Sequence, residues 1–110
     1  MKILFHPEPQ QISLAAVLYA LGDPVRLDIV RQLATSGELT CNAFDCEIAK
    51  STLSHHFKVL RESGVIYSRK EGTQHLNSLR RAELDERFPG LLDAVLGSLL
   101  SDRHAAISGN

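Results

Sequence analysis

The run from Ser51 to Gly64 places hydrogen-bond donors on one side of a predicted helix and apolar residues on the other. Leu53, Phe57 and Leu60 follow one another at helical spacing, so they form one apolar stripe. The opposite side carries Ser51, Ser54, His55, Lys58 and Arg61. A short helix with an anchored back and donors in front has the chemistry needed to read the major groove of DNA. The alternative is an ordinary amphipathic surface helix whose polar side chains are solvated.

Positive charge surrounds this segment, although the whole chain has a net charge of −1. From Lys50 to Arg81 there are seven Lys or Arg and two acidic residues, a balance of +5, while the remaining residues hold five against eleven, a balance of −6. Such clustering favours a surface that meets phosphates, although a solvated face can have the same composition. The predicted DNA contacts are Ser51, Thr52, Ser54, His55, Lys58 and Arg61 on the helix, and Arg69 and Lys70 in a polar turn. We expect His56, at the flank of the apolar stripe, to be packed and hydrogen-bonded.

Two cysteines, Cys41 and Cys46, are the residues with obvious switching chemistry. On a helix, five residues turn through ~500°, so the two thiols would point well apart. A metal ion shared by them would therefore need further ligands from either protomer, such as His6, His75 or His104. The alternative to a metal or redox site is that both cysteines are structural thiols. The sequence identifies no cofactor, and the candidate is a metal ion of unknown identity.

Helices and one hairpin must position these side chains. Asp23 and Pro24 are the residue types that begin a helix, and Gly64 supplies the left-handed conformation that ends one. The predicted helices are 11–22, 24–35, a brief helix at 40–48, the donor-rich helix from its expected cap Ser51 to Gly64, and 89–103. The predicted strands are 65–68 and 74–79, around a polar turn at 69–73 and followed by a helical turn at 80–87, and residues 38–40 could form a short extended segment. This is a mainly α fold with a small β-hairpin (α+β), a winged helix-turn-helix in the order α-α-α-α-β-β-α.

The length of 110 residues predicts a single domain over residues 1–110. The segments 11–22 and 89–103 have apolar faces too broad for one small domain to cover, so we expect them to be dimerisation helices. No apolar run approaches the ~20 residues that span a bilayer, and the first residues do not resemble a signal peptide, so we expect no membrane partner and a cytoplasmic location. No catalytic carboxylate pair, phosphate-binding glycine loop or nucleophile elbow is evident, so we expect no enzyme.

Three segments together resemble the ArsR-type winged helix-turn-helix repressors: residues 21–27 (LGDPVRL), residues 54–64 (SHHFKVLRESG) and the basic hairpin around Gly72. The resemblance covers about residues 12–100. It implies a homodimer that binds a palindromic double-stranded DNA operator and is released by an effector, often a metal ion.

The chain departs from that family pattern at its effector sites. The helix before the turn is shorter than usual, and the family's Cys-x-Cys site is replaced by the more widely spaced Cys41 and Cys46. Asp102 and His104 match only the opening of the family's other metal site, which we expect to be incomplete. The predicted function is a sequence-specific DNA-binding regulator, a homodimeric repressor that is released by a metal, a redox signal or a small molecule, or has no effector. The alternative is a winged-helix module that binds protein instead of DNA.

Overall fold

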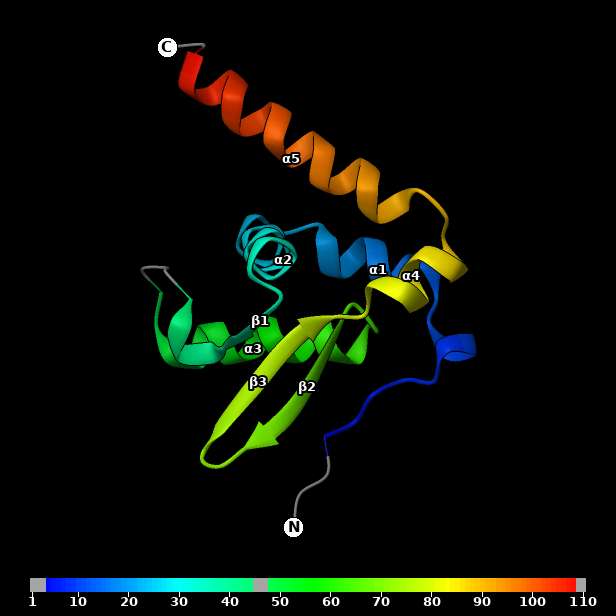
Figure 1. The fold of residues 1–110 in the computed structure, drawn as a ribbon, viewed down its shortest axis with the longest axis vertical. Coiled ribbons are helices and arrows are strands. Elements are labelled where there is room, and N and C mark those ends of the chain that lie inside the picture. The colour runs from blue at the N-terminus through cyan, green and yellow to red at the C-terminus, as the bar shows by residue number, and fades with distance from the viewer. Residues whose placement is uncertain (1–3, 45–47, 109–110) are drawn as a thin grey trace.

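The structure, a computed structural model, describes residues 4–44 and 48–108 and contains helices above and behind a small sheet (Figure 1). The helices are α1 (Leu14–Leu21), α2 (Pro24–Ser36), α3 (Lys50–Glu62), α4 (Arg81–Arg87) and α5 (Leu91–Ser108), with 3-10 turns η1 (Pro9–Gln11) and η2 (Cys41–Ala43). The strands are β1 (Glu38–Thr40), β2 (Ile66–Glu71) and β3 (Gln74–Leu79). Helix α2 packs against both α3 and α5, so it lies between α3 and the last helix (Figure 1). The predicted winged helix-turn-helix is confirmed.

The corner between α1 and α2 forms as the residue types predict. Asp23 accepts hydrogen bonds from the backbone amides of Val25 and Arg26, at 2.8 and 3.1 Å, and Pro24 is the first helical residue. A carboxylate at this position satisfies amides that have no partner inside the helix. The predicted helix start at Asp23 and Pro24 is therefore confirmed.

The start of the donor-rich helix α3 differs from the prediction. Its N-cap is Ala49 and not Ser51, because the Leu53 amide already donates to the Ala49 carbonyl at 2.9 Å. The first turn thus closes before Ser51, whose exposed side chain makes no cap. Of the brief helix predicted at 40–48, the described part is the 3-10 turn η2, and residues 45–47 lie outside the described residues.

The end of α3 depends on a close approach between backbone and side chain. Gly64 has φ 91°, and a Cβ built at this position would lie 2.6 Å from the Ile12 Cγ1 atom. Both the left-handed backbone and the contact exclude a larger residue. Glycine therefore both ends the helix, as expected, and lets the segment before α1 pack against it.

The sheet has three antiparallel strands in the order β1-β3-β2, so the predicted hairpin gains a third strand. Strand β2 also extends further than expected: Arg69 and Lys70 pair with Leu76 and His75, so they lie in a strand and the predicted turn at 69–73 is wrong in extent. The real turn is Gly72-Thr73. Gly72 has φ 63° at the first central position, where a tight II′ hairpin turn takes glycine, so two residues suffice to reverse the chain.

One aliphatic core joins these elements, and Phe44 and Phe57 meet edge to face within it with ring centroids 4.9 Å apart. Helix α5 begins at Leu91, after Gly90 with φ 82°, and continues to Ser108, so the predicted range 89–103 is shifted. Pro89 precedes the helix because the left-handed Gly90 separates the two. The C-terminal half of α5 extends beyond the rest of the domain (Figure 1). None of the helices in the described residues is long and apolar enough to cross a membrane.

Candidate nucleic-acid interface

Helix α3 has the two faces that its sequence predicts. Leu53, Phe57 and Leu60 are buried in the core. The exposed side carries Ser51, Thr52, Ser54, His55 and Lys58. Because one face is fixed by packing, these five polar side chains are presented outward on a rigid helix, where they can donate to phosphates or base edges.

His56 fastens α3 to the corner between α1 and α2. It is buried, and its Nδ1 atom lies 3.1 Å from the Arg26 Nη1 atom. Arginine is always a donor, so the His56 Nδ1 atom accepts and the ring proton is on Nε2. The Arg26 Nε atom also donates to the Ala20 carbonyl at 2.6 Å and its Nη2 atom to the Tyr19 carbonyl at 3.3 Å. The packed, hydrogen-bonded histidine expected here is confirmed, and Arg26 is its partner.

Asp23 completes this buried cluster, since its Oδ1 atom lies 3.9 Å from the His56 Nδ1 atom. Burial alone would raise the pKa of Asp23, but hydrogen bonds from the Arg26 and Val25 amides and the positive charge of Arg26 outweigh it and lower that pKa. The ionised carboxylate is therefore favoured, and it both caps α2 and complements the Arg26 charge.

The β2–β3 hairpin is here called the wing. A polar hollow of about 230 Å³ lies between α3 and the tip of the wing. Its lining residues are Cys41, Asn42, Ser54, Thr73, Gln74 and His75. The sequence prediction missed Asn42, Thr73 and Gln74 as candidate contacts and considered His75 only as a metal ligand. Their polar side chains at a hairpin tip were the available signal, but only the folded chain brings them beside Ser54.

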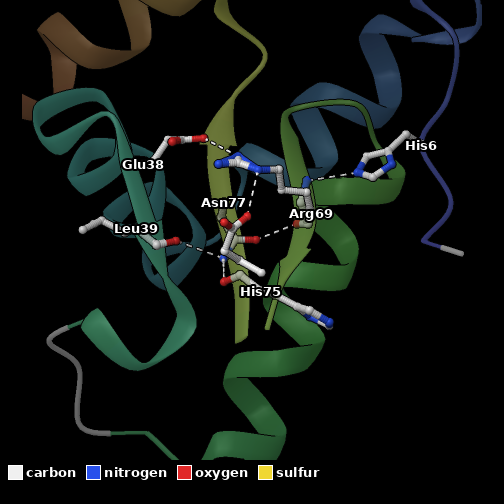
Figure 2. Close-up of polar contacts among 8 residues, drawn as sticks. His6, Glu38, Leu39, Arg69, His75 and Asn77 are labelled. Carbon is white, nitrogen blue, oxygen red and sulfur yellow. Dashed lines mark hydrogen bonds and ion pairs between the residues drawn. The ribbon is translucent and has the colours of Figure 1, made fainter. Parts of the chain in front are cut away.

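Lys70 and Arg69 lie on opposite faces of the wing. Lys70 pairs with His75, and both share the face of the buried Ser68–Asn77 pair, which is directed toward the helices. Arg69 is on the other face, where its Nη1 atom lies 3.0 Å from the Glu38 Oε2 atom and its Nε atom 3.4 Å from the Glu71 Oε2 atom (Figure 2). Arg69 therefore ties β2 to β1.

Arg61 also has partners within the domain. Its Nε atom donates to the Phe5 carbonyl at 3.1 Å, and its Nη2 atom lies 4.0 Å from the Glu62 Oε2 atom. Lys50, Lys58 and Lys70, by contrast, are exposed and make no ion pair with any side chain that the structure describes. The three lysines are thus the cations of this surface that are not occupied by internal contacts.

The sheet has a polar centre that holds its three strands together (Figure 2). Asn77 is buried; its Oδ1 atom accepts from the Ser68 hydroxyl at 2.5 Å, and its Nδ2 atom donates to the Leu39 carbonyl at 3.2 Å. The Nδ2 atom also lies 3.4 Å from the His75 carbonyl and 3.5 Å from the Cys41 Sγ atom. One amide therefore links β1, β2 and β3 with the turn before α3.

The described residues do not assemble a metal site. Cys41 is half-buried and its sulfur contacts the Asn77 amide, while Cys46 lies outside the described residues. Among the side chains that the structure describes, residues 4–44 and 48–99, no three His, Cys, Asp or Glu gather closely enough to hold a metal ion, and the side chains of Asp102 and His104 lie outside that range. His6, one of the possible further ligands, lies against β2, where the Ser68 amide donates to its Nε2 atom, and His75 lies on β3 at the hairpin tip. Neither histidine forms a three-ligand set with Cys41 among these side chains.

A second, apolar surface lies on the other side of α2. Leu14, Leu18 and Tyr19 of α1 are 47, 49 and 68 % exposed, unusual values for apolar side chains on one short helix. Beside them are two hollows, of about 560 and 350 Å³, which share Leu27 of α2 and Leu99 of α5 as lining residues.

Comparison with known proteins agrees with this architecture. A family model described as a helix-turn-helix domain matches residues 21–69. A Bacillus subtilis protein, the HTH-type transcriptional regulator YceK, is 40% identical over 84 residues, covering 74% of this chain and 84% of that protein. An arsenical resistance operon repressor of Staphylococcus xylosus is 36% identical over 75 residues, covering 66% of this chain and 71% of the repressor.

A solved structure extends the similarity to three dimensions. The transcriptional repressor BigR from Xylella fastidiosa has a TM-score of 0.60 and 32% sequence identity, covering 74% of this chain and 81% of BigR. The relatives match over most of their length, and the matched region includes α2, α3 and the first strand of the wing. The chain belongs to the ArsR family of winged helix-turn-helix transcriptional regulators.

Proposed function

We propose that this regulator is a homodimeric repressor that binds a palindromic operator in double-stranded DNA. The observation that carries the proposal is the exposed donor face of α3 beside a polar hollow that continues onto the wing. A face that binds protein usually has an apolar centre, and this one is polar and bordered by lysines. A DNA-binding role therefore fits better than a protein-interaction module, and better than catalysis.

The residues of this surface have different roles in the proposal. Helix α3 enters the major groove, where Ser54 and His55 read base edges, and Ser51, Thr52 and Lys58 contact the backbone or neighbouring bases. Lys70 and the wing tip meet the adjacent backbone. Arg61 and Arg69, which already have internal partners, support α3 and the wing and contribute less to DNA contact.

The second copy of the chain covers the apolar surface of α1, α2 and α5. Leu14, Leu18 and Tyr19 are too exposed for a domain of this size to leave in water without cost, and the two neighbouring hollows offer room for apolar side chains. In a two-fold dimer built on this face, the two α3 helices would enter successive major grooves, about 34–36 Å apart.

The effector stays a prediction: a metal ion, a redox signal, a small molecule, or none. Cys41 is the described residue with soft-ligand chemistry, and it lies in the hollow beside Ser54. Oxidation of its sulfur, or a metal bound to it, would therefore alter the surface where DNA is proposed to bind.

Fluorescence anisotropy with a duplex taken from upstream of the protein's own gene tests the proposal. We expect tight binding that weakens steeply with salt, since each phosphate neutralised contributes a slope of about −0.9 in log K against log salt. Lys58→Ala should weaken binding and reduce that slope by about one contact. Arg81→Ala is the control: it removes an exposed cation of α4 that is already paired with Asp85 and Asp93, so it should leave the slope unchanged.

The same preformed complex, challenged in turn with zinc, nickel, cobalt, arsenite and a mild oxidant, tests for an effector. Release that is lost in Cys41→Ser assigns the effector to this thiol. Absence of any binding, to this duplex and to a scrambled one at low salt, would exclude the DNA-binding proposal and favour the protein-interaction module.

A further inference from the structure

Residues 4–8, here called the strap, run along the DNA-binding half of the domain and are held by three different elements. The Arg61 Nε atom of α3 donates to the Phe5 carbonyl at 3.1 Å. The Ser68 backbone amide of β2 donates to the His6 Nε2 atom at 3.0 Å (Figure 2). The Arg80 Nη1 atom, just before α4, donates to the Pro7 carbonyl at 2.8 Å, and this bond is buried. The strap thus connects the end of the recognition helix, the wing and α4.

His6 covers the free edge of the wing. Strand β2 is an edge strand, so an amide on its outer side has no neighbouring strand to bond with. The His6 ring provides the acceptor for the Ser68 amide and stacks on Tyr67, with ring centroids 4.4 Å apart and planes at 22°. Since Ser68 is buried, loss of this acceptor leaves its amide unsatisfied in a place that water reaches poorly.

We infer that the strap is a positioning element that fixes the wing against α3, and that its contact with the wing holds only while the His6 ring is neutral. A neutral imidazole accepts at one nitrogen, whereas a protonated one donates from both. Protonation would therefore set two donors, the His6 Nε2 and the Ser68 amide, against each other. The strap is a property of the isolated protein, whereas its effect on DNA rests on the proposed function.

The charges around His6 oppose its protonation. Arg61 faces it from α3 and Arg80 from the start of α4, where Arg80 is paired with Glu83; Tyr67 faces it from β2. Burial, and then the charges of Arg61 and Arg80, lower the pKa of His6 from its ordinary value of 6.5, while a hydrogen bond with the Leu4 backbone acts the other way.

The sign of the pH dependence follows from this lowered pKa. The unfolded chain binds the proton at a higher pH than the folded chain does, so protonation favours release of the strap. The contribution of the strap is complete above pH 6.5 and is lost progressively as the pH falls from there through the lowered folded pKa.

The proposed DNA surface carries two further imidazoles, His55 and His75, which are exposed. Operator affinity measured against pH would therefore not report on His6 alone, so the strap must first be measured without DNA.

Amide hydrogen exchange of Ser68, followed by NMR on the full chain between pH 7.5 and pH 5 and corrected for intrinsic exchange, provides this measurement. We expect protection of the Ser68 amide to fall roughly tenfold across this range in the wild-type protein, together with titration of the His6 ring. His6→Gln is the matched variant, because its side-chain oxygen accepts a hydrogen bond but does not titrate. It should keep Ser68 protected throughout. Ser68 protection that is independent of pH in the wild type, or that falls equally in His6→Gln, would overturn the inference.

Operator binding then separates the strap from the proposed function. At pH 7.5, His6→Leu, which has no acceptor, should bind the operator duplex more weakly than His6→Gln, with thermal unfolding used to show that both variants are folded. Equal operator affinities for the two variants would overturn the positioning role. If no variant binds DNA while Ser68 exchange behaves as expected, the proposed function fails and the strap stands.

Discussion

At the scale of single residues, the arginines of this domain make internal contacts, whereas the lysines of the proposed DNA surface are exposed. Arg26, Arg69 and Arg80 use several donors at once to hold carbonyls, carboxylates and a histidine inside the domain. A planar guanidinium with five donors suits such fixed contacts, whereas a lysine is a flexible point charge. The side chains of Lys50, Lys58 and Lys70 remain exposed, so their flexible ammonium groups can adjust to the phosphates of a DNA backbone.

This division predicts that neighbouring cations on the wing behave differently. Lys70→Ala should weaken operator binding and reduce the salt slope by about one phosphate contact. Arg69→Ala should leave the slope nearly unchanged and lower the free energy of unfolding by about 0.2–1 kcal/mol, as expected for an exposed ion pair. Anisotropy titrations at several salt concentrations and urea denaturation measure both. Equal reductions of the slope would mean that Arg69 leaves Glu38 and Glu71 to contact DNA.

Base reading is predicted for Ser54 and His55. Replacing either by Ala should narrow the difference in affinity between the operator and a scrambled duplex, by about 1–3 kcal/mol for a lost base contact. Lys50→Ala is the control. It removes a side-chain charge that would meet the DNA backbone and not a base, so the affinity for both duplexes should fall together. Unchanged discrimination in both Ser54→Ala and His55→Ala would show that the base-reading assignment is wrong.

At the scale of elements, spacing and residue type predicted the features that depend on neighbouring residues in the sequence. The apolar stripe of α3, the cap at Asp23, the end at Gly64 and the packed His56 all follow from spacing or residue type, and the structure confirms them. The start of α3 was predicted too late, because a capping residue type identifies a possible N-cap but cannot say which turn closes first.

Features that depend on distant pairing were outside the reach of these patterns. The extended segment expected at 38–40 is present as β1, but three residues are too few to show any period, and their pairing with β3 was not predicted. Asn77 is a polar residue in a short strand, so nothing local marked it as buried. Likewise, the hollow that joins Ser54 to Gln74 and His75 exists only once the wing folds back beside α3.

We therefore expect the stability of the wing to depend most on Asn77. Asn77→Ala removes the acceptor of the Ser68 hydroxyl and the donor to the Leu39 carbonyl, both in a buried place. We expect a loss of about 1–3 kcal/mol in the free energy of unfolding, measured by urea denaturation. The exposed Asn42 offers a matched control, and Asn42→Ala should change stability by less than about 0.5 kcal/mol. A similarly small effect at Asn77 would mean that the strands are held by their ladders alone.

At the scale of the whole molecule, one buried cluster lies between the two surfaces. Arg26 holds the carbonyls of Tyr19 and Ala20 at the end of α1 and the His56 ring of α3. Asp23 belongs to the same cluster and also lines the larger hollow beside α5. Direct side-chain contacts therefore connect the end of α1, at the proposed dimer surface, with the helix α3 that is proposed to read DNA.

The proposed dimer surface makes the last prediction. Leu18 is 49 % exposed and lines the smaller hollow, so Leu18→Glu should leave the folded protomer intact but bury a charge in the interface. We expect sedimentation equilibrium to shift from dimer to monomer, and operator affinity to fall with it because a monomer holds only one half-site. Ala82→Glu adds the same charge at an exposed position of α4 and should leave the dimer intact. A Leu18→Glu protein that stays dimeric, with circular dichroism showing a folded chain, would place the interface elsewhere; one that becomes monomeric yet still binds the palindrome tightly would separate assembly from DNA recognition.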